Sequence, residues 1–199
     1  MSNEFNDNNP VTRMAVKKKA SPFFQDSGRI PPQAVDFEEA VLGALMLEKN
    51  AVNDVIDVLN PESFYKDPHQ KIYGVIHFLF GNSQPIDILT VTQELRNRGE
   101  LEYVGGAYYI SQLTNRIASA ANVEHHARII AQKFIQRELI RISSETIKMA
   151  YDETTDVFDL LDKAESSLFQ VAEGNLSKSY EKIDKVMQHA IEEIENAKD

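Results

Sequence analysis

The sequence predicts an all-α protein in which a small globular helical bundle is followed by a long helical hairpin and a terminal linker helix. Two observations favour this fold class. Apolar residues recur at three- and four-residue spacing in nearly every segment after residue 35, which is the period of one helix face. Residues 122–151 contain neither proline nor glycine, which is enough chain for one helix about 45 Å long.

Changes in composition divide the chain into four regions. Residues 1–30 mix Asn, Asp, Ser, Pro and Lys without apolar periodicity, which predicts a flexible tail. Pro31-Pro32 closes this tail, because the residue before a proline avoids helical geometry. Residues 31–121 are expected to form the globular helical subdomain, 122–174 the hairpin, and 175–199 a linker region with an amphipathic helix.

Capping and breaking residues mark the first three helices of the globular subdomain. We expect Asp36 to cap the first helix and Asn60-Pro61 to stop the second. Asp67 followed by Pro68 is a helix-start signal, in which a capping carboxylate precedes a proline at the first helical position. The third helix should then end at Gly81.

Two more short helices complete the predicted subdomain. Asp87 is a suitable cap for the fourth helix, and Gly99 is its terminator. The Gly105-Gly106 pair predicts a turn, and the fifth helix follows it.

The predicted hairpin has two arms, residues 122–151 and a second apolar segment that stops at Gly174, joined by a polar turn at 152–156. Two helices cover only part of each other's surface, so we expect homo-association through the hairpin. The same residues could also seal the hairpin's own interface, and the pattern leaves both interpretations open. The candidates for self-association and partner contact are Val123, Ile129, Ile130, Phe134, Leu160, Leu161 and Leu168.

The last predicted helix carries an apolar stripe that the rest of the chain has little surface to cover. A stripe of this kind indicates docking on a partner. The docking candidates on this helix are Ile183, Met187, Ala190, Ile191 and Ile194.

The formal net charge of −10 disfavours direct binding to nucleic acid, because an acidic surface repels phosphate backbones. The basic run Lys17–Lys19 lies in the tail, where we interpret it as solvated. The chain has no cysteine, which excludes disulfides and thiolate metal sites and suits a cytoplasmic protein. It also lacks an apolar run long enough to span a membrane, and MSNEFNDNNP does not resemble a secretory signal.

A search for chemistry gives no catalytic, cofactor-binding or metal-binding candidate. A phosphate-binding loop needs a glycine followed by lysine, and no glycine of this chain is followed by lysine. His125 and His126 point about 100° apart on a helix, so they do not share an ion easily. We therefore expect no enzyme activity in this chain. A metal-dependent hydrolase would depend only on scattered histidines and carboxylates.

Eight short motifs follow one another in order between about Pro31 and Ile142. They are Leu42-Gly43-Ala44, Phe64-Tyr65, His69, Ile72-Tyr73, Pro85-Ile86-Asp87, Gly105-Gly106, Ala120-Ala121-Asn122 and Arg137-Glu138-Leu139-Ile140. In this order the motifs resemble the amino-terminal domain of one family, the DnaB-type replicative DNA helicases. One position differs, since that family usually has Tyr where this chain has His126.

The resemblance implies a role as a non-catalytic module of a bacterial, cytoplasmic helicase. In that family the amino-terminal domains pair through their hairpins, and a trimer of dimers forms a collar above six motor domains. The carboxy-terminal domain of primase docks on the collar, as does a helicase loader in some lineages. The last helix is similar in position to a linker helix that packs on a neighbouring motor domain. ATP and Mg²⁺ would be bound only by the motor, which is expected beyond Asp199. The alternative is a free-standing helical adaptor with the same fold.

Overall fold

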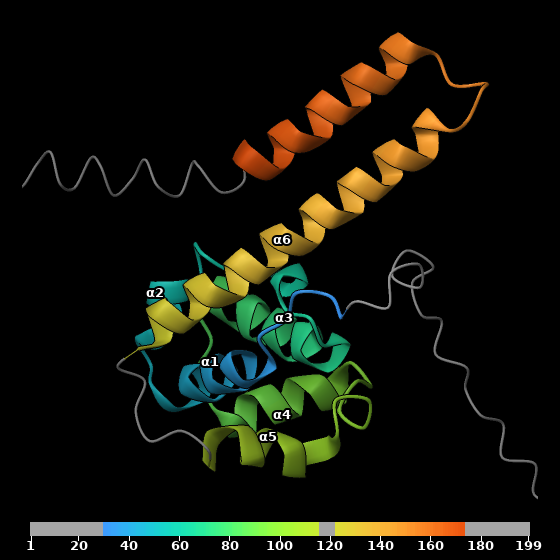
Figure 1. Cartoon of the computed structure of the whole chain (residues 1–199). Coiled ribbons are helices and arrows are strands. Elements are labelled where there is room, and N and C mark those ends of the chain that lie inside the picture. The colour runs from blue at the N-terminus through green and yellow to red at the C-terminus, as the bar shows by residue number, and fades with distance from the viewer. Residues whose placement is uncertain (1–29, 116–121, 174–199) are drawn as a thin grey trace, which may run out of the picture. The chain divides into compact units, whose positions relative to one another are not determined.

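The computed structural model describes residues 30–115 and 122–173, and within these ranges every regular element is a helix (Figure 1). The chain divides into two compact units, Met1–Ile30 and Pro31–Asp199, and the helices of the described residues belong to the second. The predicted all-α fold class is confirmed. The elements are α1 (Val35–Leu47), α2 (Ala51–Val55), η2 (Pro61–Ser63), α3 (Asp67–Gly81), α4 (Ile88–Asn97), α5 (Gly106–Asn115), α6 (Val123–Ala150) and a further helix at 157–173.

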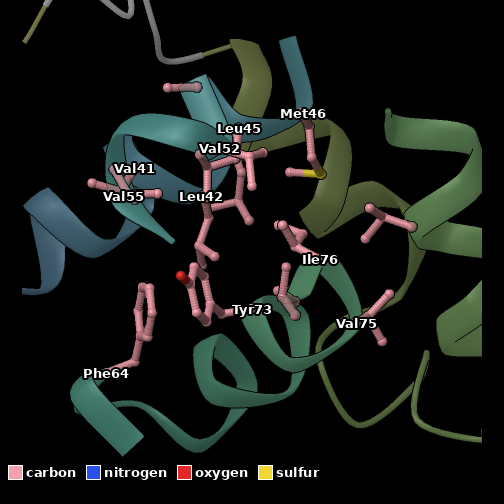
Figure 2. Packing of buried hydrophobic residues seen from close by; sticks show 14 of the residues in the cluster. Val41, Leu42, Leu45, Met46, Val52, Val55, Phe64, Tyr73, Val75 and Ile76 are labelled. Carbon is pink, nitrogen blue, oxygen red and sulfur yellow. The ribbon is translucent and has the colours of Figure 1, made fainter. Parts of the chain in front are cut away.

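The core of the bundle surrounds α1, which packs against α3, α5 and α6. Leu42 and Leu45 of α1 are fully buried and lie above Tyr73 of α3 (Figure 2). The ring of Phe64 packs on Tyr73 with centroids 4.8 Å apart. The Tyr73 hydroxyl donates to the Leu59 carbonyl at 3.3 Å, so this buried polar group keeps a partner.

The start of α4 agrees with its prediction. Asp87 is the N-cap, and its Oδ1 accepts the amides of Leu89 and Thr90 at 2.9 Å each. Thr90 returns the contact, since its Oγ1 accepts the Asp87 amide at 3.0 Å. This reciprocal pair satisfies amide groups that would otherwise lack an acceptor at the helix end.

The predicted caps of the first and third helices are wrong. Asp36 lies inside the first turn of α1, and Asp67 is the first residue of α3 rather than its cap. Both carboxylates still lie at the positive end of a helix dipole, where a negative charge stabilises the helix. The chain enters α3 through Tyr65 and Lys66, whose amides are accepted by a carboxylate of α1, Glu38. Glu38 thus fixes the segment that precedes α3, while no side chain caps the first turn of this helix.

The second helix is shorter than predicted. It ends at Val55, and a turn continues to Val58 before the short 3₁₀ helix η2. Leu59, just after this turn, is nevertheless buried in the core.

The turn before α5 depends on glycine. Gly105 and Gly106 have φ angles of +105° and +72°, which side chains rarely adopt. A Cβ on Gly105 would also lie 3.0 Å from the Cβ of Tyr109. The sequence around this turn is therefore constrained by backbone geometry as well as by space.

One uninterrupted helix, α6, connects the core to the hairpin (Figure 1). Its first turns are buried in the core, and its second half runs antiparallel beside the helix at 157–173, where Lys163 Nζ lies 3.1 Å from Glu145. In the turn between them, Asp156 Oδ1 accepts the Phe158 amide at 2.8 Å. The predicted hairpin and its polar turn are confirmed for the described residues. The predicted domain boundaries stay predictions, and the tail at 1–29 and the terminal linker helix lie outside the described residues.

Candidate interaction surface

The hairpin exposes many large apolar side chains. Among them, Tyr151 is 85% exposed, Phe158 75% and Leu161 60%. Large apolar side chains that are exposed together on one element are typical of an interaction site. We call this set the hairpin surface, and its members are Leu139, Ile140, Ile147, Tyr151, Val157, Phe158, Leu161, Leu168 and Phe169.

Helix geometry places three members of the hairpin surface on one stripe. Val157, Leu161 and Leu168 lie within about 40° of one another around their helix axis. Leu160 points about 100° away from Leu161 and lines a small space together with Ile142 of α6. The stripe therefore lies beside the side chains that close the hairpin, since Leu160 is about 60° from Val157, and Leu161 is its member furthest from them.

The candidate residues separate into three groups. Val123 and Ile130 are 5% and 1% exposed inside the core of their own subunit, so their assignment to partner contacts is wrong. Their periodicity marked an apolar face correctly, but the bundle covers that face. Leu160 is half-buried toward α6, in agreement with the interpretation that it seals the hairpin.

The remaining hairpin candidates stay predictions, and two of them are well placed. Leu161 and Leu168 are exposed on the stripe, while Ile129 and Phe134 are half-buried. The linker-helix candidates Ile183, Met187, Ala190, Ile191 and Ile194 lie outside the described residues.

Sequence reasoning missed seven members of the hairpin surface. A signal was present around Val157-Phe158 and Leu160-Leu161, where apolar residues fill more than one face of the helix. A two-helix hairpin needs only one apolar stripe on each helix, so the excess indicates a further contact. The missed residues are Leu139, Ile140, Ile147, Tyr151, Val157, Phe158 and Phe169.

The two arms of the hairpin carry opposite charge. Over Val123–Ala150, α6 has five basic and three acidic residues, a net charge of +2. Residues 157–173 have four acidic and one basic residue, a net charge of −3. The arms therefore attract each other, and a second copy would meet the same complementarity if its α6 lay against this acidic helix.

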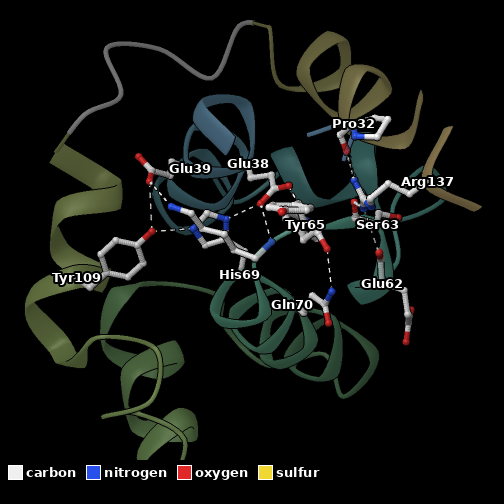
Figure 3. Close-up of polar contacts among 12 residues, drawn as sticks. Pro32, Glu38, Glu39, Glu62, Ser63, Tyr65, His69, Gln70, Tyr109 and Arg137 are labelled. Carbon is white, nitrogen blue, oxygen red and sulfur yellow. Dashed lines mark hydrogen bonds and ion pairs between the residues drawn. The ribbon is translucent and has the colours of Figure 1, made fainter. Parts of the chain in front are cut away.

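The bundle contains a second notable feature, a buried polar network on α1, α3 and α5 (Figure 3). Glu38 Oε1 accepts the Tyr65 amide at 2.7 Å, and its Oε2 lies 2.6 Å from His69 Nδ1. His69 Nε2 lies 2.7 Å from the Tyr109 hydroxyl. Glu38 and His69 are 1% and 0% exposed, so no substrate reaches this pair. The buried network consequently holds helices together, and it does not form an open acid–base site.

Arg137 of α6 is adjacent to the buried network (Figure 3). Its guanidinium donates to the carbonyls of Pro32 at 3.0 Å and Ser63 at 2.7 Å. The rings of Tyr65 and Phe134 each lie 5.7 Å from it. Burial lowers the pKa of Arg137, and the nearby carboxylate of Glu38 acts in the opposite direction.

Other kinds of site were sought in the same part of the chain. Residues 30–115 and 122–173 contain no cluster of three or more His, Asp or Glu side chains that could hold a metal ion. None of the helices in these ranges is long and apolar enough to cross a membrane.

Comparison with known proteins gives one consistent result. Residues 30–132 match the family described as DnaB-like helicase N terminal domain. The chain is 44% identical over 171 residues to replicative DNA helicase DnaB of Rhodothermus marinus, covering 86% of this chain and 18% of that protein. It is 38% identical over 167 residues to replicative DNA helicase DnaC of Bacillus subtilis (strain 168), covering 84% of this chain and 37% of that protein. The chain thus spans less than two fifths of the length of these relatives.

Two solved structures are similar to the fold. The N-terminal domain of DnaB helicase from Mycobacterium tuberculosis superposes with a TM-score of 0.68 at 36% identity, covering 71% of this chain and 99% of that chain. A DnaB-like replicative helicase, studied with its interactions with primase, has a TM-score of 0.59 at 24% identity, covering 76% of this chain and 35% of that chain. The second likeness supports the fold alone.

Proposed function

The chain belongs to the DnaB-like helicase N-terminal domain family, and from this premise we propose that it is the oligomerisation and partner-docking module of a hexameric replicative DNA helicase. Its copies pair through their hairpins, and three such dimers build the collar. The module needs no cofactor, because ATP and Mg²⁺ belong to the motor domain of the parent helicase. The relatives named above are bacterial, and we place the protein in the bacterial cytoplasm.

The exposed stripe of the hairpin is the observation that supports this proposal. Val157, Leu161 and Leu168 are too exposed to contribute to the core of one subunit. A second copy is a suitable cover, since a two-fold interface joins the same patch on both subunits. Burying apolar surface contributes about 25 cal/mol per Å², so even a few such residues matter for pairing.

Primase is the proposed docking partner. A structural neighbour was solved in a study of its interactions with primase, although its likeness to this chain supports only the fold. The carboxy-terminal domain of primase would contact parts of the hairpin surface that the second copy leaves free. A helicase loader and the neighbouring motor domain, which would receive the linker helix, are further proposed partners.

The proposal is tested by light scattering over a concentration series. The wild-type chain has a monomer mass of 22.6 kDa, and we expect its mass to rise to that of a dimer or hexamer with concentration. The double variant Leu161→Glu/Leu168→Glu should remain monomeric with unchanged helix content, because both side chains are exposed and charge disfavours a buried interface. Ser166→Glu is the matched control: it adds a charge to an exposed position about 160° from Leu168, and it should associate normally.

Addition of the cognate primase carboxy-terminal domain should increase the mass further. A wild-type chain that stays monomeric at all concentrations and ignores primase would contradict the proposal. So would a double variant that associates as strongly as the wild type. A reading frame that continues past Asp199 into a phosphate-binding loop would eliminate the alternative, a free-standing helical adaptor.

A further inference from the structure

Helix α6 is buried at two separate points along its length. Its last fully buried core residue is Ile130, while the next buried residue, Ile142, packs toward the other arm of the hairpin. About 18 Å of helix separates these two points at the α-helical rise. The core packing of the first turns of α6 constrains the direction in which the hairpin leaves the bundle, and contacts between these two points can fix it further.

Arg137 lies between these two points and holds α6 to two other segments. Nη1 donates to the Pro32 carbonyl in the segment before α1, and Nη2 donates to the Ser63 carbonyl in η2. The Glu62 carbonyl lies 3.5 Å from Nη2 as a third, weaker acceptor. One side chain therefore ties α6 to residues that are 74 and 105 positions away in sequence.

The residues around Arg137 suit a guanidinium group. The rings of Tyr65 and Phe134 flank it, and flat aromatic rings favour the planar cation. The carbonyl acceptors are neutral and do not balance the positive charge of Arg137. The buried carboxylate of Glu38 is close enough to stabilise this charge. Glu38 is itself fixed by the Tyr65 amide, so the buried network and the Arg137 contacts meet at Tyr65.

We propose that Arg137 is a positioning residue that sets the angle between the globular bundle and the hairpin. The fork of donors on a guanidinium reaches the Pro32 and Ser63 carbonyls at once, whereas the single ammonium of a lysine does not span both. This inference goes beyond the proposed function, because it concerns the geometry within one chain and requires no partner.

A small change of this angle has a large effect at the hairpin tip. From Arg137 to Ala150 the helix extends about 20 Å, so a tilt of about 10° displaces its end by about 3.5 Å. A gap of only about 0.5–1 Å already removes a quarter to a half of the dispersion energy of an atom pair. A hairpin with a loose base would therefore present its surface poorly to any rigid partner.

The test is a distance measurement between the bundle and the hairpin tip. The chain has no cysteine, so spin labels can be placed on Gln84→Cys, which is exposed in the bundle, and Glu153→Cys, which is exposed in the hairpin turn. Labelled chain is diluted into an excess of unlabelled chain, so that only distances within one chain are recorded. Pulsed electron resonance then gives the distance distribution for each variant.

We compare Arg137→Gln and Arg137→Lys with the control Arg141→Gln. Arg141 lies one turn further along α6, and its partners Glu138 and Glu145 are on the same helix. Both Arg137 variants should shift or widen the distribution by about 3 Å or more, the displacement expected from the tilt. The control should leave it unchanged, and circular dichroism should show the same helix content in all variants.

The proposal is overturned if both Arg137 variants keep the wild-type distribution, or if Arg141→Gln widens it equally. The lysine variant keeps the charge, so it stays informative if Arg137→Gln does not fold. A failure of self-association would leave this result unaffected, because the distance is measured inside single chains.

Discussion

Replacing Glu38 with alanine should weaken the bundle more than almost any other single change. The side chain is 1% exposed and accepts the Tyr65 amide at 2.7 Å and the His69 ring at 2.6 Å. Its removal leaves two buried donors without an acceptor, together with the space of the lost side chain. Water cannot replace the carboxylate without entering the core between α1 and α3.

Two estimates give the same magnitude for this loss. Each buried donor left without a partner costs about 1–3 kcal/mol, so two cost about 2–6 kcal/mol. Breaking a buried charged pair by removing one member typically costs about 3–5 kcal/mol. At about 2–4 °C per kcal/mol for a chain of this size, Glu38→Ala should lower the Tm by about 6–20 °C.

Urea and thermal unfolding followed by circular dichroism measure this effect, at a fixed protein concentration because association also stabilises the fold. Asp36→Ala is the matched control: it removes an exposed carboxylate from the first turn of the same helix, α1. Because an exposed carboxylate near a helix start contributes little, the control should cost less than about 1 kcal/mol. Equal destabilisation by the two variants would refute the reasoning, since the buried network would then contribute nothing beyond a surface carboxylate.

Three further predictions concern single positions. Ile130→Ala should cost about 2–5 kcal/mol in urea unfolding, because this side chain is 1% exposed and its loss leaves a cavity in the core. Gly105→Ala should destabilise the fold by more than about 1 kcal/mol in the same assay, since its φ is +105° and the new Cβ would lie 3.0 Å from Tyr109. Gly99→Ala should cost less, because Gly99 has a φ of +70° and no atom within 4 Å of a new Cβ. Burial lowers the pKa of His126 in the folded chain, so as the pH falls below about 6.5 the unfolded chain binds a proton on this ring before the folded chain does. The folded state therefore loses stability over that pH range. In a pH series of unfolding curves, His126→Tyr should lose less stability than the wild type.

The sequence predicts elements whose signals are local. The cap at Asp87 and the absence of proline and glycine in α6 both act within a few residues, and both predictions agree with the structure. The start of α3 at Asp67-Pro68 was also predicted from local residues, but the partner of the amides just before it was not. Its entering amides are satisfied by Glu38, 27 residues before Tyr65, and local patterns do not reveal such a partner.

The exposed residues of the hairpin surface could likewise be predicted only in part from the sequence. Periodicity assigned Ile130 and Leu161 equally to an apolar face, but it does not say what covers that face. The bundle covers the first residue and leaves the second exposed. The role of His69 was missed for a related reason, since its ring nitrogens bind residues 31 and 40 positions away.

The continuity of α6 has a consequence for how the chain can vary in length. Because one helix serves both the core and the hairpin, the core residue Ile130 and the exposed Leu139 are locked in rotational phase. Inserting one residue between them would turn the whole hairpin by about 100° and advance it by about 1.5 Å, with every residue of the bundle intact. An insertion of four residues would turn it by only about 40° but lengthen the stem by about 6 Å. Apart from Arg137, exposed residues in this stretch of helix can be substituted one at a time, whereas its length is fixed by the direction in which the hairpin must face.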